Sequence, residues 1–273
     1  MGVQRCFGIF TILLLLSFSF AFAESLREWD KKAVEKYKKA KADYLKVKNF
    51  YEKARKEWKD LKRKARSAKG NNTVNLDKAR NFLLRADEFL IANLKKIRAY
   101  VESEPSIDNQ TREEILSAIS SDIEWLVKKQ DEIKNAKTKK ELSLIARAIR
   151  KKWNEVRPKV KRFVGKVARF KAGKIIKKAE KLAERVEKAI AKLKEKGVDT
   201  KELEEWLAKF RKDIEIAKEK AKKAKEKHEA IKGMKDADKL FREGHLFLKG
   251  ANKVIRADYL RLKEIVRKMR NGK

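Results

Sequence analysis

The stretch from Leu26 to Ala68 reads LREWDKKAVEKYKKAKADYLKVKNFYEKARKEWKDLKRKARSA and holds neither glycine nor proline. Within it, aromatic residues recur every seven positions: Tyr37, Tyr44, Tyr51 and Trp58. A second set of mostly small or aliphatic residues keeps to the same spacing: Leu26, Ala33, Ala40, Val47, Ala54 and Leu61. A seven-residue repeat places both sets along a narrow stripe of an α-helix. The stretch therefore predicts one long helix whose stripe packs on a partner helix, either within the chain or in a second copy through self-association.

The composition extends this prediction to the whole chain. Of its 273 residues, 10 are glycine, 2 are proline and 1 is cysteine, while 42% are hydrophobic. Sandwiches, barrels and Rossmann-type domains need more turn residues, and a disulfide scaffold needs paired cysteines. A bias toward Ala, Glu, Lys, Leu and Arg is typical of long helices. We therefore expect an all-α protein, an elongated antiparallel helical bundle or coiled coil of about seven long helices.

Few residues interrupt these helices. Asn75 is a candidate N-cap, and the sequences TREE from Thr111 and TKKE from Thr138 read as capping boxes. Pro158 lacks the amide hydrogen that a helix interior uses, so we expect the helix to kink or restart there. Beyond Gly173 the apolar stripe rotates, which predicts a bend or a change of partner. The expected segments are 24–70 (long heptad helix), 71–137 (near-neutral helical hairpin), 138–198 (strongly basic helical segment) and 199–273 (C-terminal helical hairpin).

Residues 1–23 resemble a secretory signal. Arg5 precedes an apolar run from Cys6 to Phe22, and an A-x-A cleavage site ends at Ala23. The run is slightly short for a membrane span of about 20 residues, so an uncleaved N-terminal anchor is the alternative. Lysines and arginines soon after the run favour keeping the body in the cytoplasm. The sequons at Asn71 and Asn109, both expected in loops, would instead be N-glycosylation sites of an exported protein. We expect export, with the protein secreted or held at the cell surface.

Positive charge is distributed unevenly along the chain. The 75 Lys and Arg outnumber the 40 Asp and Glu, so the formal net charge is +35. Segment 71–137 has 11 basic and 12 acidic residues, whereas segment 138–198 has 22 basic and 6 acidic. The excess peaks between residues 147 and 178, where Glu155 is the one acid. The fourteen cations of this peak are the candidate polyanion-binding residues: Arg147, Arg150, Lys151, Lys152, Arg157, Lys159, Lys161, Arg162, Lys166, Arg169, Lys171, Lys174, Lys177 and Lys178.

So many cations in one segment attract polyanions, because binding releases the counterions that gather around each partner. DNA, RNA, an acidic glycan or an anionic membrane would all serve, and Phe163 and Phe170 could enter a lipid interface. No base-recognition motif is present, so nucleic-acid binding would be independent of sequence. The opposing interpretation is a solvated surface without a partner, since the Lys and Glu enrichment resembles that of hyperthermophile proteins.

Catalytic and metal-binding motifs are absent from the sequence. The two histidines, His228 and His245, are expected on different helices, and no cysteine or acidic cluster accompanies them. His228 continues the apolar stripe of its helix, which predicts a packed side chain. We expect no catalytic residue, cofactor or metal. The sequence thus favours a non-enzymatic, exported helical protein that binds polyanions. The alternative is a membrane-tethered nucleic-acid-binding protein facing the cytoplasm.

Overall fold

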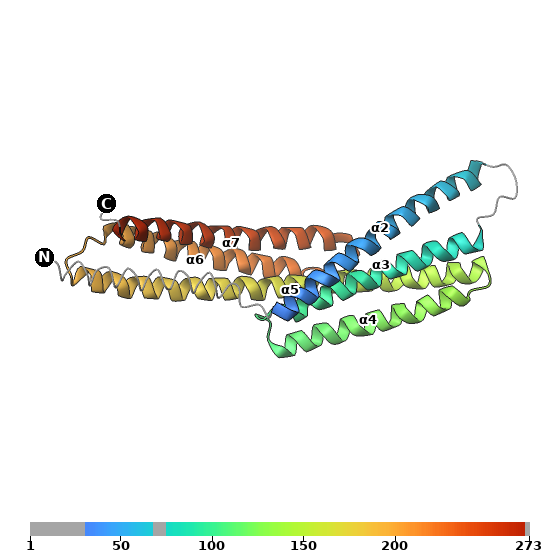
Figure 1. Ribbon diagram of the computed structural model, residues 1–273, viewed down its shortest axis with the longest axis horizontal. Helices are drawn as coiled ribbons and strands as arrows, with labels where there is room; N and C mark the ends of the chain where they lie inside the picture. Colours follow the sequence, from blue (N-terminus) through green and yellow to red (C-terminus); the bar gives the residue numbers. More distant parts are fainter. Residues whose placement is uncertain (1–30, 68–74, 271–273) are drawn as a thin grey trace. The chain divides into compact units, whose positions relative to one another are not determined.

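The computed structural model describes residues 31–67 and 75–270, and of residues 65–67 only the backbone. The described residues form six α-helices and no strand, which confirms the all-α prediction (Figure 1). They are α2 (Lys31–Ser67), α3 (Leu76–Glu102), α4 (Asn109–Asn135), α5 (Lys139–Lys194), α6 (Lys201–Glu229) and α7 (Met234–Arg270). The expected signal or anchor at 1–23 and the sequon at Asn71 lie outside the described residues. None of the described helices has an apolar stretch long enough to cross a membrane.

Of the two outcomes expected at Pro158, a kink or a restart of the helix, the restart is wrong. α5 is a single helix of 56 residues that contains Pro158, so the described residues form six helices where about seven were expected. Proline inside a helix costs about 3 kcal/mol through its missing hydrogen bond and its ring clash. Here Val156 and Val160 on either side are buried, and burial of two valines contributes about 3 kcal/mol or more. Packing therefore offsets the local preference.

The chain divides into two compact units. Among the described residues, the N-terminal unit comprises 31–67 and 75–164 together with Lys232–Lys235, and the C-terminal unit comprises Gly165–Ile231 and the residues from Asp236 onward. α5 therefore changes partners between Val164 and Gly165. The rotation of its apolar stripe predicted such a change about two turns later, at Gly173.

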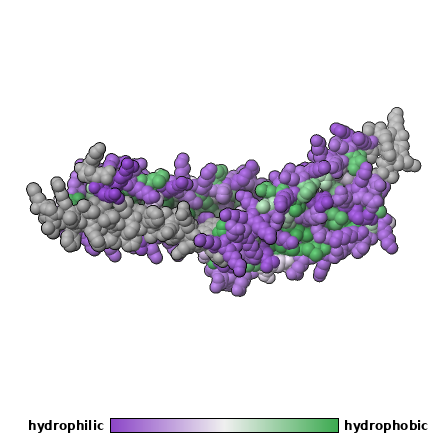
Figure 2. Space-filling model, in the orientation of Figure 1, coloured by the Kyte–Doolittle hydropathy of each residue, from purple (hydrophilic) through white to green (hydrophobic). Residues whose placement is uncertain are grey.

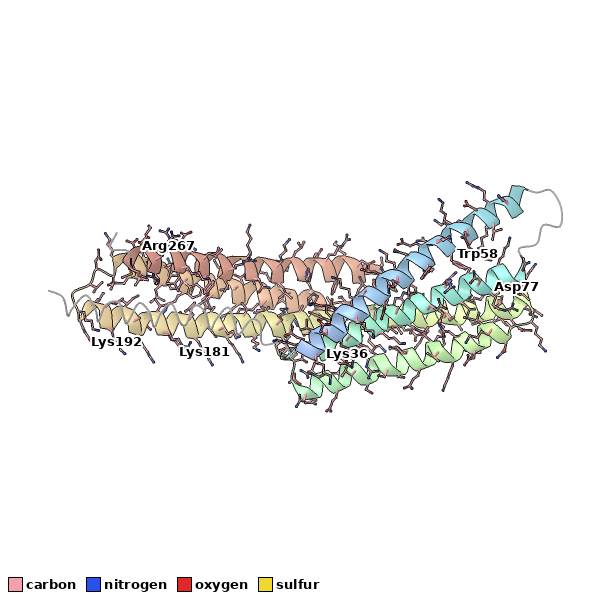
Figure 3. All side chains as sticks on the ribbon, viewed as in Figure 1. Lys36, Trp58, Asp77, Lys181, Lys192 and Arg267 are labelled. Carbon is pink, nitrogen blue, oxygen red and sulfur yellow. The ribbon has the colours of Figure 1, made fainter. Side chains whose placement is uncertain are left out.

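In the N-terminal unit, α2 packs on α3 through the aromatic stripe. Ring centroids lie 5.6 Å apart for Tyr37 and Tyr100, 5.6 Å for Tyr44 and Phe89, 4.9 Å for Tyr51 and Phe89, and 5.1 Å for Trp58 and Phe82. The residue numbers rise along α2 as they fall along α3, so the two helices are antiparallel. The ladder extends from the end of α2 that carries Lys36 toward Trp58 (Figure 3). The stripe prediction is confirmed, with the partner inside the chain.

α3 and α4 form the buried layer beneath this ladder. Their inward residues include Leu94, Val101, Ile115, Ile119 and Ile133, all of them fully buried. In contrast, Ala54 is the one buried residue among the α2 side chains that the structure describes. α2 is therefore an outer helix with most of its circumference in solvent.

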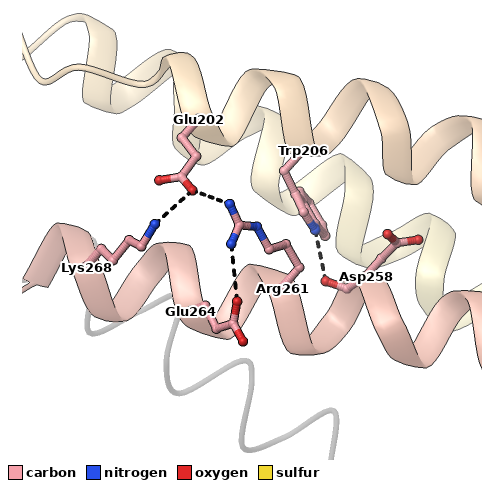
Figure 4. A network of polar contacts seen from close by, with 6 residues as sticks. All are labelled: Glu202, Trp206, Asp258, Arg261, Glu264 and Lys268. Atoms are coloured by element: carbon pink, nitrogen blue, oxygen red, sulfur yellow. Dashed lines mark hydrogen bonds and ion pairs between the residues drawn. The ribbon is translucent and has the colours of Figure 1, made fainter.

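The C-terminal unit joins the second part of α5 to α6 and α7. Ion pairs between Lys218 and Glu180 (2.8 Å) and between Arg211 and Glu187 (2.7 Å) show that α5 and α6 are antiparallel. Its core contains Leu193, Leu203, Phe210, Ile255 and Ile265, among others. Polar contacts join α6 and α7 (Figure 4): Trp206 Nε1 donates to the Asp258 carbonyl oxygen (2.9 Å), and Glu202 accepts from Arg261 (2.7 Å) and Lys268 (3.4 Å).

The helix starts are partly as predicted. Asn75 caps α3 by accepting from the Asp77 backbone N–H (2.7 Å), and Thr138 caps α5 by accepting from that of Glu141 (3.2 Å). The capping box at Thr111 is wrong, because α4 starts earlier and Asp108 accepts from the Thr111 backbone N–H (2.8 Å). Asn109 is consequently the first residue of α4 rather than part of a loop, and it is exposed.

Candidate polyanion-binding surface

All fourteen predicted cations lie on α5. The eight from Arg147 to Arg162 belong to the N-terminal unit, and the six from Lys166 to Lys178 belong to the C-terminal unit. Four of them are exposed: Arg147, Arg150, Lys151 and Lys177. The other ten are half-buried. The structure therefore separates a set that the sequence presents as uniform.

Arg147, Arg150 and Lys151 form the exposed cationic face of α5 in the N-terminal unit. This face turns outward because Leu142, Ile149 and Val156 on the other side of the helix are buried. None of the three cations makes an ion pair with another described residue. Beside them, the side chain of Leu144 is 55% exposed. The arrangement presents three exposed cationic side chains within about one and a half turns of helix.

Lys152 and Lys159 have an internal role instead. Both bind the buried carboxylate of Asp122 on α4, Lys152 through Oδ1 at 3.0 Å and Lys159 through Oδ2 at 2.5 Å. The two lysines are seven residues apart, so they lie on the same side of α5, about two turns from each other. A buried carboxylate needs such partners, because an unpaired buried charge costs several kcal/mol. These two lysines serve to join α4 to α5.

Arg169 also has an internal partner. Its guanidinium donates to the Lys225 carbonyl oxygen (3.3 Å) and lies 3.4 Å from the Glu229 carboxylate, both on α6. Burial lowers the pKa of this guanidinium, and the negative charge of Glu229 counters part of that effect. Arg169 thus holds α5 to α6 within the C-terminal unit.

The remaining predicted cations contribute less exposed charge. Seven of them are half-buried: Arg157, Lys161, Arg162, Lys166, Lys171, Lys174 and Lys178. Lys177 lies on the rim of a shallow groove of about 850 Å³ between α5 and α6. The ion pair between Lys218 and Glu180 crosses this groove, and its lining mixes lysine and arginine with Glu180, Glu184 and Glu215. The groove is consequently less cationic than the face at Arg147, Arg150 and Lys151.

His228 is packed in the C-terminal unit, as its position on the apolar stripe predicted. Its side chain is 1% exposed and lies between Gly165 of α5 and Gly244 of α7. Burial lowers the pKa of His228 to about 4, and the nearby charge of Arg169 adds to the shift. His245 is exposed. Within the described ranges, no group of three or more His, Cys, Asp or Glu side chains is placed to hold a metal ion.

Asp87 is the other isolated buried group, in the N-terminal unit. It lies on α3 with its side chain fully buried, and burial raises the pKa of its carboxyl to about 7. The side chain of Gln130 on α4 opposes part of that rise, and the negative charge of Glu88 adds to it. Asp87 is thus a buried carboxyl within the core of this unit.

The visible surface is dominated by hydrophilic residues, with smaller hydrophobic areas among them (Figure 2).

Comparisons with known proteins found no match: no family model, no curated protein and no solved structure matches this chain.

Proposed function

We propose that this protein is a non-enzymatic helical binding protein, exported or displayed at the cell surface, that holds polyanions through the cationic face of α5. In this proposal the helices of each unit form an antiparallel bundle that serves as a rigid support. The observation that carries the proposal is the exposed set of Arg147, Arg150 and Lys151, which lack an ion-pair partner among the described residues.

Electrostatics explains why this face favours a polyanion. Three neighbouring cations repel one another, and in water they keep counterions close to the surface. An anionic polymer displaces those counterions, so affinity falls by a factor of about 8 per contacted phosphate for each tenfold rise in salt. The contacts involve charge alone, which supports binding without sequence specificity.

The first experiment measures the salt dependence of binding to heparin and to a single-stranded oligonucleotide. The test variant is R147S/R150S/K151S. The matched control is K78S/K95S/K128S, which removes the same charge from exposed positions on α3 and α4 in the same unit. We expect the test variant to lower the slope of log K against log salt by about 2 to 3, as three lost phosphate contacts require. Equal slopes for the two variants would remove the α5 face from the proposal.

The alternative, a membrane-tethered protein that binds nucleic acid in the cytoplasm, is favoured by the lysines and arginines that follow the apolar run. N-terminal sequencing and intact-mass measurement of protein from its native cell separate the two proposals. A mature start at Glu24, or a glycan on Asn109, supports export. A retained apolar run without glycan supports the tether.

A further inference from the structure

A second cationic face lies on α2, and its geometry follows from the aromatic ladder. Lys39, Lys46 and Lys53 each come two residues after a ladder residue, namely Tyr37, Tyr44 and Tyr51. Two residues correspond to about 200° around a helix. The lysines therefore lie on the side of α2 that faces away from α3. Their seven-residue spacing places them about 10.5 Å apart along one line, which we call the α2 lysine line.

The α2 lysine line is fully in solvent. All three side chains are exposed, and none forms an ion pair with another described residue. Exposed Lys56 lies one turn after Lys53 on the same side of the helix. One acid interrupts the line, the exposed Asp43, which lies one turn from both Lys39 and Lys46. The line ends where Glu57 and Asp60 follow it. Between Lys39 and Lys56 this side of α2 thus carries a net positive charge.

One large apolar side chain lies within the line. Phe50 is 58% exposed and is one helical turn from both Lys46 and Lys53. On its inner side, the centroid of its ring lies 5.8 Å from the Arg85 guanidinium, which is itself paired with Glu88 at 2.8 Å. Leu45 is 48% exposed, but it lies about 100° from Lys46 around the helix and one turn from Lys41. Water solvates the exposed part of the Phe50 ring poorly, so a partner that removes it from water is favoured.

We propose that the α2 lysine line, with Phe50, docks on the surface of an anionic lipid bilayer. Lysines near such a surface are attracted to its acidic headgroups, and an apolar side chain beside them enters the interface between headgroup and acyl chain. Docking leaves the ladder intact, because the ladder occupies the opposite side of α2. Nucleic acid or an acidic glycan would use the lysines but would offer no apolar layer for Phe50.

The order of segments along the chain supports the same partner. The apolar run that ends at Phe22 precedes Lys31, the first residue of α2, by only eight residues. If the run is retained as an anchor, α2 begins next to the membrane surface. If it is removed, the lysine line itself supplies the attraction. The inference rests on α2 alone and does not require the α5 face to bind anything.

The first test compares two triple variants of the full chain by co-sedimentation with vesicles. K39Q/K46Q/K53Q removes the lysine line, and K41Q/R55Q/K59Q removes the same charge from exposed positions of α2 more than 100° away around the helix. Vesicles contain phosphatidylcholine alone or with 30% phosphatidylserine. The ratio of the two affinities measures the electrostatic preference for anionic lipid, because any insertion of the apolar run contributes to both. We expect this ratio to fall about 100-fold in the line variant and less than tenfold in the control. Equal losses, or no preference in the unmodified protein, would overturn the inference.

The second test reports whether Phe50 meets lipid. A polarity-sensitive fluorophore is attached at position 50 of the variant C6S/F50C, with C6S/L260C as the control because Leu260 is similarly exposed on α7. We expect a blue shift at position 50 with phosphatidylserine vesicles and none with heparin, and no shift at position 260. A shift at position 50 that persists in R147S/R150S/K151S separates this surface from the α5 face. An unshifted probe, or an equal shift with heparin, contradicts lipid docking.

Discussion

Lowering the pH from 7 to 4 should destabilise the C-terminal unit, because His228 is held where a positive charge has no compensation. The ring contacts two helices so closely that glycine is required on both. A Cβ at Gly165 would lie 2.6 Å from His228 Cγ, and one at Gly244 would clash with Nε2. Neither ring nitrogen makes a hydrogen bond of ordinary geometry with a described residue. Burial opposes protonation most strongly, Arg169 and His245 add to it, and the Phe241 backbone and Glu229 offset only part of the effect.

The magnitude follows from the shift in pKa. Folding lowers the pKa of His228 from 6.5 to about 4, so the folded unit favours the neutral ring. The stabilisation is complete above pH 6.5 and is lost as the pH falls toward 4, where the unfolded chain has already bound the proton. A difference of about 2.5 pKa units corresponds to about 3 kcal/mol.

Hydrogen exchange of α6 and α7 peptides, followed by mass spectrometry between pH 7 and 4 with correction for the intrinsic rate, measures this loss within the unit itself. We expect H228Q to be less stable at pH 7, because the packing between the glycines changes, but to lose little further stability on acidification. H245Q, which alters the exposed histidine, should keep the full loss of about 3 kcal/mol. The reasoning would be refuted if H228Q and the unmodified protein lost the same stability between pH 7 and 4.

Three further predictions concern buried charges and glycines. Burial raises the pKa of Asp87 from 3.8 to about 7, so the destabilising effect of this carboxyl grows as the pH rises through that range. D87N should therefore raise the free energy of unfolding, measured with urea at pH 8, by up to about 4 kcal/mol. D122A leaves two lysines without their carboxylate, so it should lower the free energy of unfolding in urea by about 3 to 5 kcal/mol. D131A, which breaks an exposed ion pair, should lower it by less than about 1 kcal/mol. G165A should lower the melting temperature because of the contact with the histidine ring. At position 173 an added Cβ meets nothing within 4 Å. G173A should therefore raise the melting temperature, because alanine lowers the entropy of the unfolded chain and so stabilises the fold by about 0.5 to 1 kcal/mol.

The aromatic ladder shows which part of the fold sequence periodicity can predict. Tyr37, Tyr44, Tyr51 and Trp58 repeat every seven residues without interruption, so the existence of a packed stripe followed directly. Its partner did not, because Phe82 and Phe89 on α3 keep the seven-residue interval only once, and Tyr100 follows Phe89 after eleven residues. The contact between the two stripes is therefore a property of the fold rather than of either stripe alone.

Pro158 shows where a local rule failed. Its missing amide hydrogen is a property of one residue, and a sequence-based prediction gives it full weight. The buried valines at 156 and 160 belong to an apolar stripe that continues across the proline. The free energy of that packing is a property of the assembled unit, so it could be judged only after the partners of α5 were known.

The same distinction separates the cations that are available to a ligand from those that are not. Lys151 and Lys152 are adjacent in sequence and equal in every count of charge, yet Lys151 is exposed while Lys152 binds Asp122. One residue along a helix is a rotation of about 100°, and the carboxylate that decides between them comes from another helix. Net charge per segment could therefore locate the cationic region without identifying its binding residues. The α2 lysine line was not singled out from the sequence, although its seven-residue interval is present there. Which side of α2 faces solvent is known only once the ladder shows which side packs on α3. A cation can serve a ligand only if the fold has left it without an internal carboxylate, and both proposed surfaces are defined by that criterion.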